Sequence, residues 1–256
     1  MVTYRSPREW KIMREAGRAV ARTLAAVRDA AEPGVPLAEL DAVAARTLKE
    51  MDARSSFLGY RPDWTSVPYP AMVCVSVNEV IVHGVPHAHI TLKDGDVVSV
   101  DCGAEVGGYH GDAAITFVVG EADADAERLV AATARALDDA IAAARPGNRM
   151  GDISHAVDRV ARANGYGAPD GWGGHGIGTA MHEDPGVPNR GRPGRGLRLR
   201  EGLTIAIEPM FHEGGGNETR VLDDDWSIAT ADGSRAAHFE HTVAITADGP
   251  RVLTLP

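Results

Sequence analysis

Residues 1–50 alternate apolar and polar positions with the period of an α-helix. Ser6-Pro7-Arg8-Glu9 forms a capping box with proline at the first helical position. The pattern predicts a long amphipathic helix that ends near Gly34 and a second helix over residues 37–51. The apolar faces of these helices comprise Ile12, Met13, Ala16, Val20, Leu24 and Val27 in the first, and Leu40, Val43, Ala44 and Leu48 in the second.

The same order of elements returns later in the chain. Residues 71–119 have the composition of strands, and an Ala-rich helix is predicted over residues 123–145. The segment that starts at Gly147 leads into a further helix, much as the segment that starts at Gly34, 113 residues earlier, leads into the helix from residue 37. Strands and turns follow to the end of the chain. We therefore expect an α+β fold with two helix-helix-sheet halves, about residues 1–120 and 121–256, and no linker.

Two aspartates lie on one predicted hairpin. Residues 97–119 are predicted to form two strands joined by a turn on Val106-Gly107 or Gly107-Gly108. With the first turn Asp112 lies directly opposite Asp101, and with the second it lies one diagonal step away. In both cases the two side chains are on the same face of the hairpin. Adjacent carboxylates among apolar residues repel unless a proton or a cation neutralises them. The hairpin therefore predicts a proton-sharing pair or a metal site.

Three further ligand candidates follow along the chain. His175 lies in the glycine-rich segment 173–178, Glu208 ends an apolar strand before Pro209, and Glu240 lies within residues 238–242. Each of them alone is also compatible with a turn or structural role, so the inference depends on their combination. Four carboxylates and one imidazole suit a pair of divalent ions better than a single closed zinc site.

Composition narrows the class of protein. Of 256 residues 44% are apolar, which suffices for a packed core, and no run approaches the 18 apolar residues of a membrane span. The start lacks the layout of a signal peptide, so we expect a cytoplasmic enzyme. A formal charge of −10 argues against a DNA-binding protein. Cys74 and Cys102 are expected to be reduced thiols, with Cys102 packed on the face opposite Asp101.

Six segments occur in the order and at the separations typical of one enzyme family. They are residues 77–86 with His83, the hairpin of Asp101 and Asp112, and residues 174–178, 181–185, 207–210 and 239–242. Together they resemble the type I methionine aminopeptidases over nearly the whole chain. The resemblance implies the pita-bread fold, a dinuclear metal site between the two halves, and residues 1–256 as a single catalytic domain.

The resemblance also implies the metal ligands. Asp112 and Glu240 would bridge both ions, Asp101 would chelate one of them, and His175 and Glu208 would bind the other. Two cations lower the pKa of a bound water and polarise the scissile carbonyl, and Glu208 would be the general base. The ions would be cobalt, manganese or iron(II), because this ligand set does not select among them.

The substrate-binding residues are implied in the same way. His182 would contact the scissile amide as charge develops on its oxygen, and His83 would bind the substrate or leaving nitrogen. The remaining positions fall where the family forms its methionine pocket: Cys74, Tyr60, Met181 and Trp226. The segment 61–68 is several residues longer than the usual loop, so the sequence leaves open whether Tyr60 or Tyr69 faces the pocket.

The expected activity is removal of the initiator methionine from nascent chains with a small second residue. The protein would act as a monomer on polypeptide N-termini, without DNA or a membrane as partner. The Arg-rich segment 190–200 is expected to be a solvated loop, since it lacks interleaved aromatic residues, and a transient ribosome contact is left open. The alternatives are an Xaa-Pro aminopeptidase or dipeptidase of the same fold, disfavoured by the segment 77–84, and a non-catalytic binding module, disfavoured because all five ligands are present.

Overall fold

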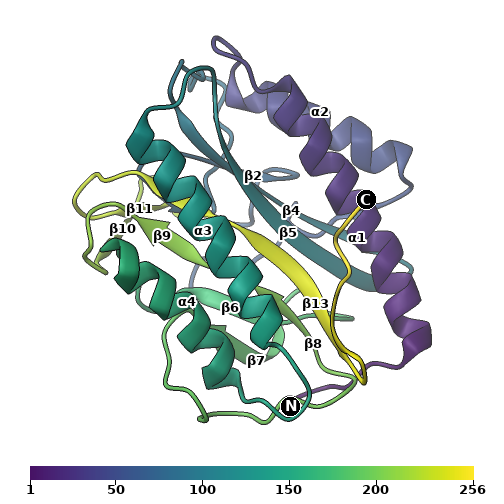
Figure 1. Ribbon diagram of the computed structural model, residues 1–256. Helices are drawn as coiled ribbons and strands as arrows, with labels where there is room; N and C mark the ends of the chain where they lie inside the picture. The colour runs from purple at the N-terminus through teal and green to yellow at the C-terminus, as the bar shows by residue number, and fades with distance from the viewer.

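A curved sheet with four helices on one face forms the molecule, as the computed structural model of residues 1–256 shows (Figure 1). The helices are α1 (Pro7–Ala30), α2 (Leu37–Glu50), α3 (Ala124–Ala143) and α4 (Met150–Asn164). All four predicted helices are therefore confirmed, and their ends lie close to the predicted ones. None of them is both long and apolar enough to cross a bilayer.

Each pair of helices precedes a group of strands, so the predicted order of two helix-helix-sheet halves is confirmed. The strands of the first half are β1 (Arg54–Ser55), β2 (Cys74–Val77), β3 (Val80–Val82), β4 (Val97–Val106) and β5 (Tyr109–Val118). Those of the second half are β6 (Gly173–Gly176), β7 (Glu183–Pro188), β8 (Thr204–Ile207), β9 (Met210–His212), β10 (Thr219–Val221), β11 (Ile228–Thr230), β12 (Ala236–His238), β13 (Glu240–Thr246) and β14 (Gly249–Val252).

The two halves join in the middle of the main sheet. Its strand order is β1-β4-β5-β13-β8-β6-β7, with β2 on β4 and β14 on β13. The strands β5 and β13 pair antiparallel, with Glu240 opposite Ala114 and His241 opposite Ala113. We call this junction the seam. There β5 of the first half lies beside β13 of the second (Figure 1).

The helices cover two separate apolar cores. One core lies between α1, α2 and the sheet and contains Val20, Leu40 and the fully buried Cys102; the other lies under α3 and α4. The predicted capping box is present, because the Glu9 amide donates to Ser6 Oγ and the Ser6 amide donates to Glu9 Oε2. Because both cores lie on the helix side of the sheet, the strand side chains on the opposite face are the ones available to form a site at the seam.

Helix α1 approaches the backbone of its neighbours closely at one glycine. A Cβ atom on Gly17 would overlap the carbonyl oxygen of Leu253, and one on Gly111 of β5 would lie 2.9 Å from the Gly17 nitrogen. The contact requires residues without side chains on both elements. It sets the distance of α1 from the strand that carries Asp112.

We predict that Gly17→Ala destabilises the protein. Alanine in an open helix is favoured over glycine by about 1 kcal/mol, but the overlap with the Leu253 backbone should cost about 1–3 kcal/mol or more. Gly186→Ala is the matched control, because nothing lies within 4 Å of a Cβ atom at that exposed position. Urea unfolding of both variants measures the effect. A Gly17→Ala protein as stable as the wild type would contradict this account of the packing.

Candidate metal centre and substrate cavity

The hairpin of β4 and β5 places two aspartates on one face. Its turn lies on Gly107 and Gly108, which both have positive φ angles of 56° and 81°. Asp101 lies opposite Ala114 and Gly103 lies opposite Asp112, so the two aspartates are one diagonal step apart. This is one of the two arrangements that the sequence predicted.

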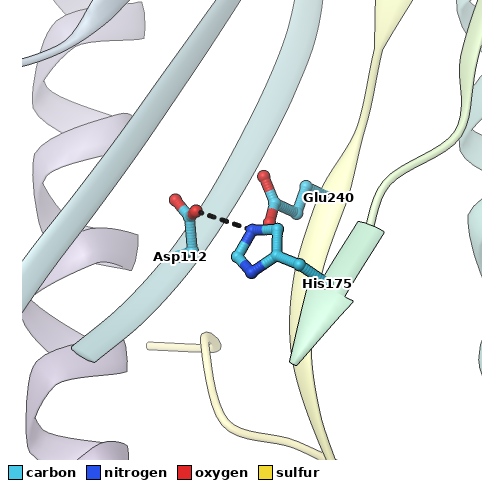
Figure 2. Close-up of side chains that lie close together, drawn as sticks. All are labelled: Asp112, His175 and Glu240. Atoms are coloured by element: carbon cyan, nitrogen blue, oxygen red, sulfur yellow. Dashed lines mark ion pairs between the residues drawn. The ribbon is translucent and has the colours of Figure 1, made fainter. Parts of the chain in front are cut away.

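Strands of the second half bring the other three predicted ligands to the same place. Glu240 begins β13, His175 lies on β6, and Glu208 directly follows β8. The Nε2 atom of His175 is 3.7 Å from Asp112 Oδ2 and 3.8 Å from Glu208 Oε1. Figure 2 shows Asp112, His175 and Glu240 converging from β5, β6 and β13. The structure therefore brings all five residues together at the seam.

Their carboxylates are buried and lack counter-charges from lysine or arginine. Burial and then the charge of Asp112 raise the pKa of Asp101 well above its usual value. Burial also raises the pKa of Asp112, with Glu208 as the next cause, and that of Glu240, with Asp112 as the next cause. For Glu208 burial acts in the same direction, but the imidazoles of His238 and His175 outweigh it and lower its pKa.

The donor atoms at the seam fit a divalent metal. One oxygen each of Asp101, Asp112 and Glu240 is buried without any hydrogen-bond partner. Buried carboxylates without partners are unfavourable unless a cation coordinates them. Oxygen donors with an imidazole form a set that divalent first-row metals accept. The residues present therefore suit metal binding.

Sequence reasoning missed His238. Its side chain is 2% exposed, and its Nε2 atom is 3.4 Å from Glu208 Oε2 and 3.9 Å from Glu240 Oε2. The available signal was its position two residues before Glu240, which puts both side chains on one face of an extended chain. His241, the residue after Glu240, is hydrogen-bonded through Nδ1 to Thr254 Oγ1 at 2.8 Å.

A cavity of about 550 Å³ opens beside the carboxylates. Its lining includes all the positions that the sequence implied for substrate binding: His83, His182, Cys74, Tyr60, Met181 and Trp226. Phe57 and the buried Tyr69 complete an apolar wall. A larger groove of about 790 Å³, beside β2, β3 and residues 220–227, contains none of the five ligands. The smaller cavity is therefore the one that borders the five predicted metal ligands.

Tyr60 contacts one of the two cavity histidines directly. Its hydroxyl is 2.8 Å from His182 Nδ1, and the two rings stack with centroids 5.2 Å apart. The ring of His182 also lies 4.1 Å from that of His175. Desolvation and then His175 lower the pKa of His182, so its imidazole is neutral near pH 7.

The long loop 61–68 contacts the other histidine. Trp64 stacks on His83 with ring centroids 5.9 Å apart, and Trp226 Nε1 donates a hydrogen bond to the Val67 carbonyl at 2.9 Å. The loop therefore forms part of the cavity wall. Tyr69, which follows it, donates its hydroxyl to backbone carbonyls beneath the wall.

His83 is held without a polar partner for its Nδ1 atom. Its φ angle of 59° lies in the left-handed region, which non-glycine residues rarely occupy. The rings of Trp64, Trp172 and Trp226 surround the imidazole, and burial lowers its pKa to about 4. Aromatic packing and backbone conformation thus fix its orientation.

This chain is similar to known proteins in both sequence and structure. Residues 11–247 match metallopeptidase family M24. The chain is 50% identical over 262 residues to methionine aminopeptidase 1 of Mycobacterium tuberculosis, covering 100% of this chain and 96% of that protein. The solved structure of methionine aminopeptidase from Thermotoga maritima has a TM-score of 0.95 and 41% identity, with 100% of both chains covered.

A more distant structure shares the fold alone. The prolidase from Pyrococcus furiosus has a TM-score of 0.79 at 22% identity, over 99% of this chain and 66% of that one. With the methionine aminopeptidase structure, this likeness confirms the expected pita-bread fold. The resemblance seen in the sequence motifs is likewise confirmed. Because the family match spans most of the chain and the buried donor set suits divalent metal, this protein belongs to metallopeptidase family M24.

Proposed function

We propose that the protein is a methionine aminopeptidase that removes the initiator methionine from nascent proteins and peptides with a small second residue. The observation that carries this proposal is the meeting of five metal-ligand side chains with an apolar cavity that two neutral histidines share. The relatives of 41% and 50% identity named above are methionine aminopeptidases, which supports it over the proline-specific alternative.

The proposed centre holds two divalent ions, which would be cobalt, manganese or iron(II). Asp112 and Glu240 would hold both ions, Asp101 would bind one, and His175 and Glu208 would bind the other. When bound, such ions polarise a carbonyl and lower the pKa of coordinated water. These ligands come from β4, β5, β6, β13 and the end of β8, in both halves of the chain, which makes residues 1–256 one catalytic domain in this proposal.

The protein's own side chains would carry the proton transfers. Glu208 accepts the proton of the attacking water, because its carboxylate borders the cavity, lies 3.8 Å from His175 Nε2 and is close enough for its charge to act on His182. His182 donates its Nε2 proton toward the scissile carbonyl oxygen as negative charge develops there. Tyr60 holds Nδ1 of the same ring, which leaves Nε2 for the substrate. His83, fixed by Trp64, contacts the substrate or leaving nitrogen.

The apolar wall would receive the methionine side chain. Cys74, Met181 and Trp226 offer soft and aromatic surfaces that suit an unbranched thioether. Tyr60 occupies the edge of this wall and also contacts His182. Tyr60 thus belongs both to the proposed methionine pocket and to the surroundings of His182. A methionine bound in this pocket would have the peptide bond that follows it beside the proposed metal ligands.

The proposed setting is the cytoplasm, where the protein matures nascent chains as a monomer. A transient ribosome contact would use the Arg-rich loop 190–200. Its members without a salt bridge are all exposed: Arg192, Arg195, Arg198 and Arg200. Such side chains are free to contact phosphates in a salt-dependent way.

Losing a bridging carboxylate should abolish turnover. We expect Asp112→Ala and Glu240→Ala to lower the rate of Met-Ala-Ser cleavage by more than about 10²-fold, because the remaining charges then hold the ions poorly. Glu121→Ala, which removes an exposed carboxylate just after the end of β5, is the control. Near-normal rates at saturating metal in either seam variant would rule out the proposed bridging roles.

Removing His182 should separate catalysis from metal binding. We expect His182→Ala to keep its bound metal while kcat falls by about 10²-fold or more, as for loss of an oxyanion donor. Metal content by elemental analysis and steady-state kinetics measure the two effects. Loss of metal in this variant would instead make His182 a ligand.

Substrate preference should depend on the first two residues separately. Peptides that start Met-Ala or Met-Gly should be cleaved far better than those that start Met-Leu or Met-Lys, because the ions and both histidines crowd the second residue. The apolar wall favours methionine over shorter side chains by about 1–3 kcal/mol per methylene group, so norleucine should remain a substrate. Faster cleavage of X-Pro than of Met-Ala peptides in such a panel would favour the proline-specific alternative.

A further inference from the structure

One buried imidazole at the seam has no role in the proposed function. His238, at the end of β12, is 2% exposed, and its Nε2 atom makes no hydrogen bond. The two nearest acidic atoms belong to Glu208, at 3.4 Å, and Glu240, at 3.9 Å. A nitrogen so close to two proposed metal ligands requires an explanation.

The backbone of His238 is anchored from the other half of the molecule. Its amide donates to Thr116 Oγ1 at 2.9 Å and to Ser99 Oγ at 3.2 Å, and its carbonyl accepts from Thr116 Oγ1 at 2.6 Å. In addition, His238 pairs with Met210 between β12 and β9. The fold therefore fixes the position from which the imidazole reaches the carboxylates.

The separations match those of His175, which is a proposed ligand. His175 Nε2 lies 3.7 Å and 3.8 Å from two ligand oxygens, and His238 Nε2 lies 3.4 Å and 3.9 Å from two. Two donors about 3.4 Å apart would subtend an angle of about 110° at an ion with bonds of about 2.1 Å. An N–H donor to a carboxylate usually lies at about 2.7–2.9 Å. The spacing at His238 thus suits a shared cation better than a hydrogen bond.

The donor atoms form two groups that share one residue. Asp112, His175 and Glu240 offer atoms within 4.8 Å of one another, and so do Glu208, His238 and Glu240. Each group contains one imidazole. Figure 2 shows the first group, with the side chains of Asp112, His175 and Glu240 lying close together.

We propose that His238 Nε2 is a sixth protein ligand of the metal centre, on the ion that Glu208 and Glu240 hold. This inference rests on the metal site proposed above. A second imidazole makes the donor set softer, so cobalt and zinc should bind more tightly relative to manganese than they would with five ligands. The role is one of metal selection as well as metal retention.

The test counts imidazole ligands in the metal-loaded protein. X-ray absorption at the cobalt edge should show two imidazoles per pair of ions in the wild type and one in His238→Gln. His212→Gln is the matched control, because His212 is also buried with both ring nitrogens unpaired and lies on β9 of the same two-stranded sheet. Titration of the metal-free proteins should show about 10- to 100-fold weaker cobalt binding for His238→Gln alone.

A single imidazole in the wild type would overturn the inference, and this measurement requires no variant to fold. Equal imidazole counts and equal cobalt affinity in wild type and His238→Gln would overturn it as well. Cleavage of Met-Ala-Ser by the same wild-type sample is followed separately. Active enzyme with one imidazole would exclude His238 as a ligand and leave the proposed function intact. Two imidazoles without cleavage would support His238 as a ligand and contradict the proposed function.

Discussion

Buried negative charge at the seam is the constraint on which the rest of the structure depends. Asp101 and Asp112 come from the first half, and Glu208 and Glu240 come from the second. Without a cation these carboxylates repel one another in a low-dielectric site. With divalent metal the same charges attract one centre from both sides. The metal would thus join the two halves at the place where β5 and β13 pair.

The substrate cavity is constructed differently, from aromatic packing. Trp64, Trp172 and Trp226 surround His83, and Tyr60 stacks on His182, so both histidines have fixed orientations. Their low pKa values keep them neutral beside a centre that binds cations. A charged imidazole there would compete with the metal, whereas a neutral one can donate a single hydrogen bond to the substrate. The apolar wall and the chemistry therefore use the same residues.

Local patterns in the sequence predicted the helices and the hairpin. The helical period, the capping box and the strand register set by a turn at Gly107-Gly108 all depend on residues close together in the sequence. The gathering of His175, Glu208 and Glu240 came from the family resemblance, since the pairing of β5 with β13 joins residues more than a hundred positions apart. His238 was missed because the segment that carried the resemblance, residues 239–242, starts one residue after it. The contact of Trp64 with His83 depends on how the long loop 61–68 folds back, and no local pattern specifies that.

The central claim is that metal at the seam performs the cleavage. The most direct measurement follows Met-Ala-Ser cleavage by chelator-treated protein while cobalt or manganese is added and bound metal is counted in the same samples. We predict no cleavage without metal, and activity that rises with metal occupancy and saturates at two ions per chain. Full cleavage by metal-free protein, or saturation of activity with no ion bound, would contradict it.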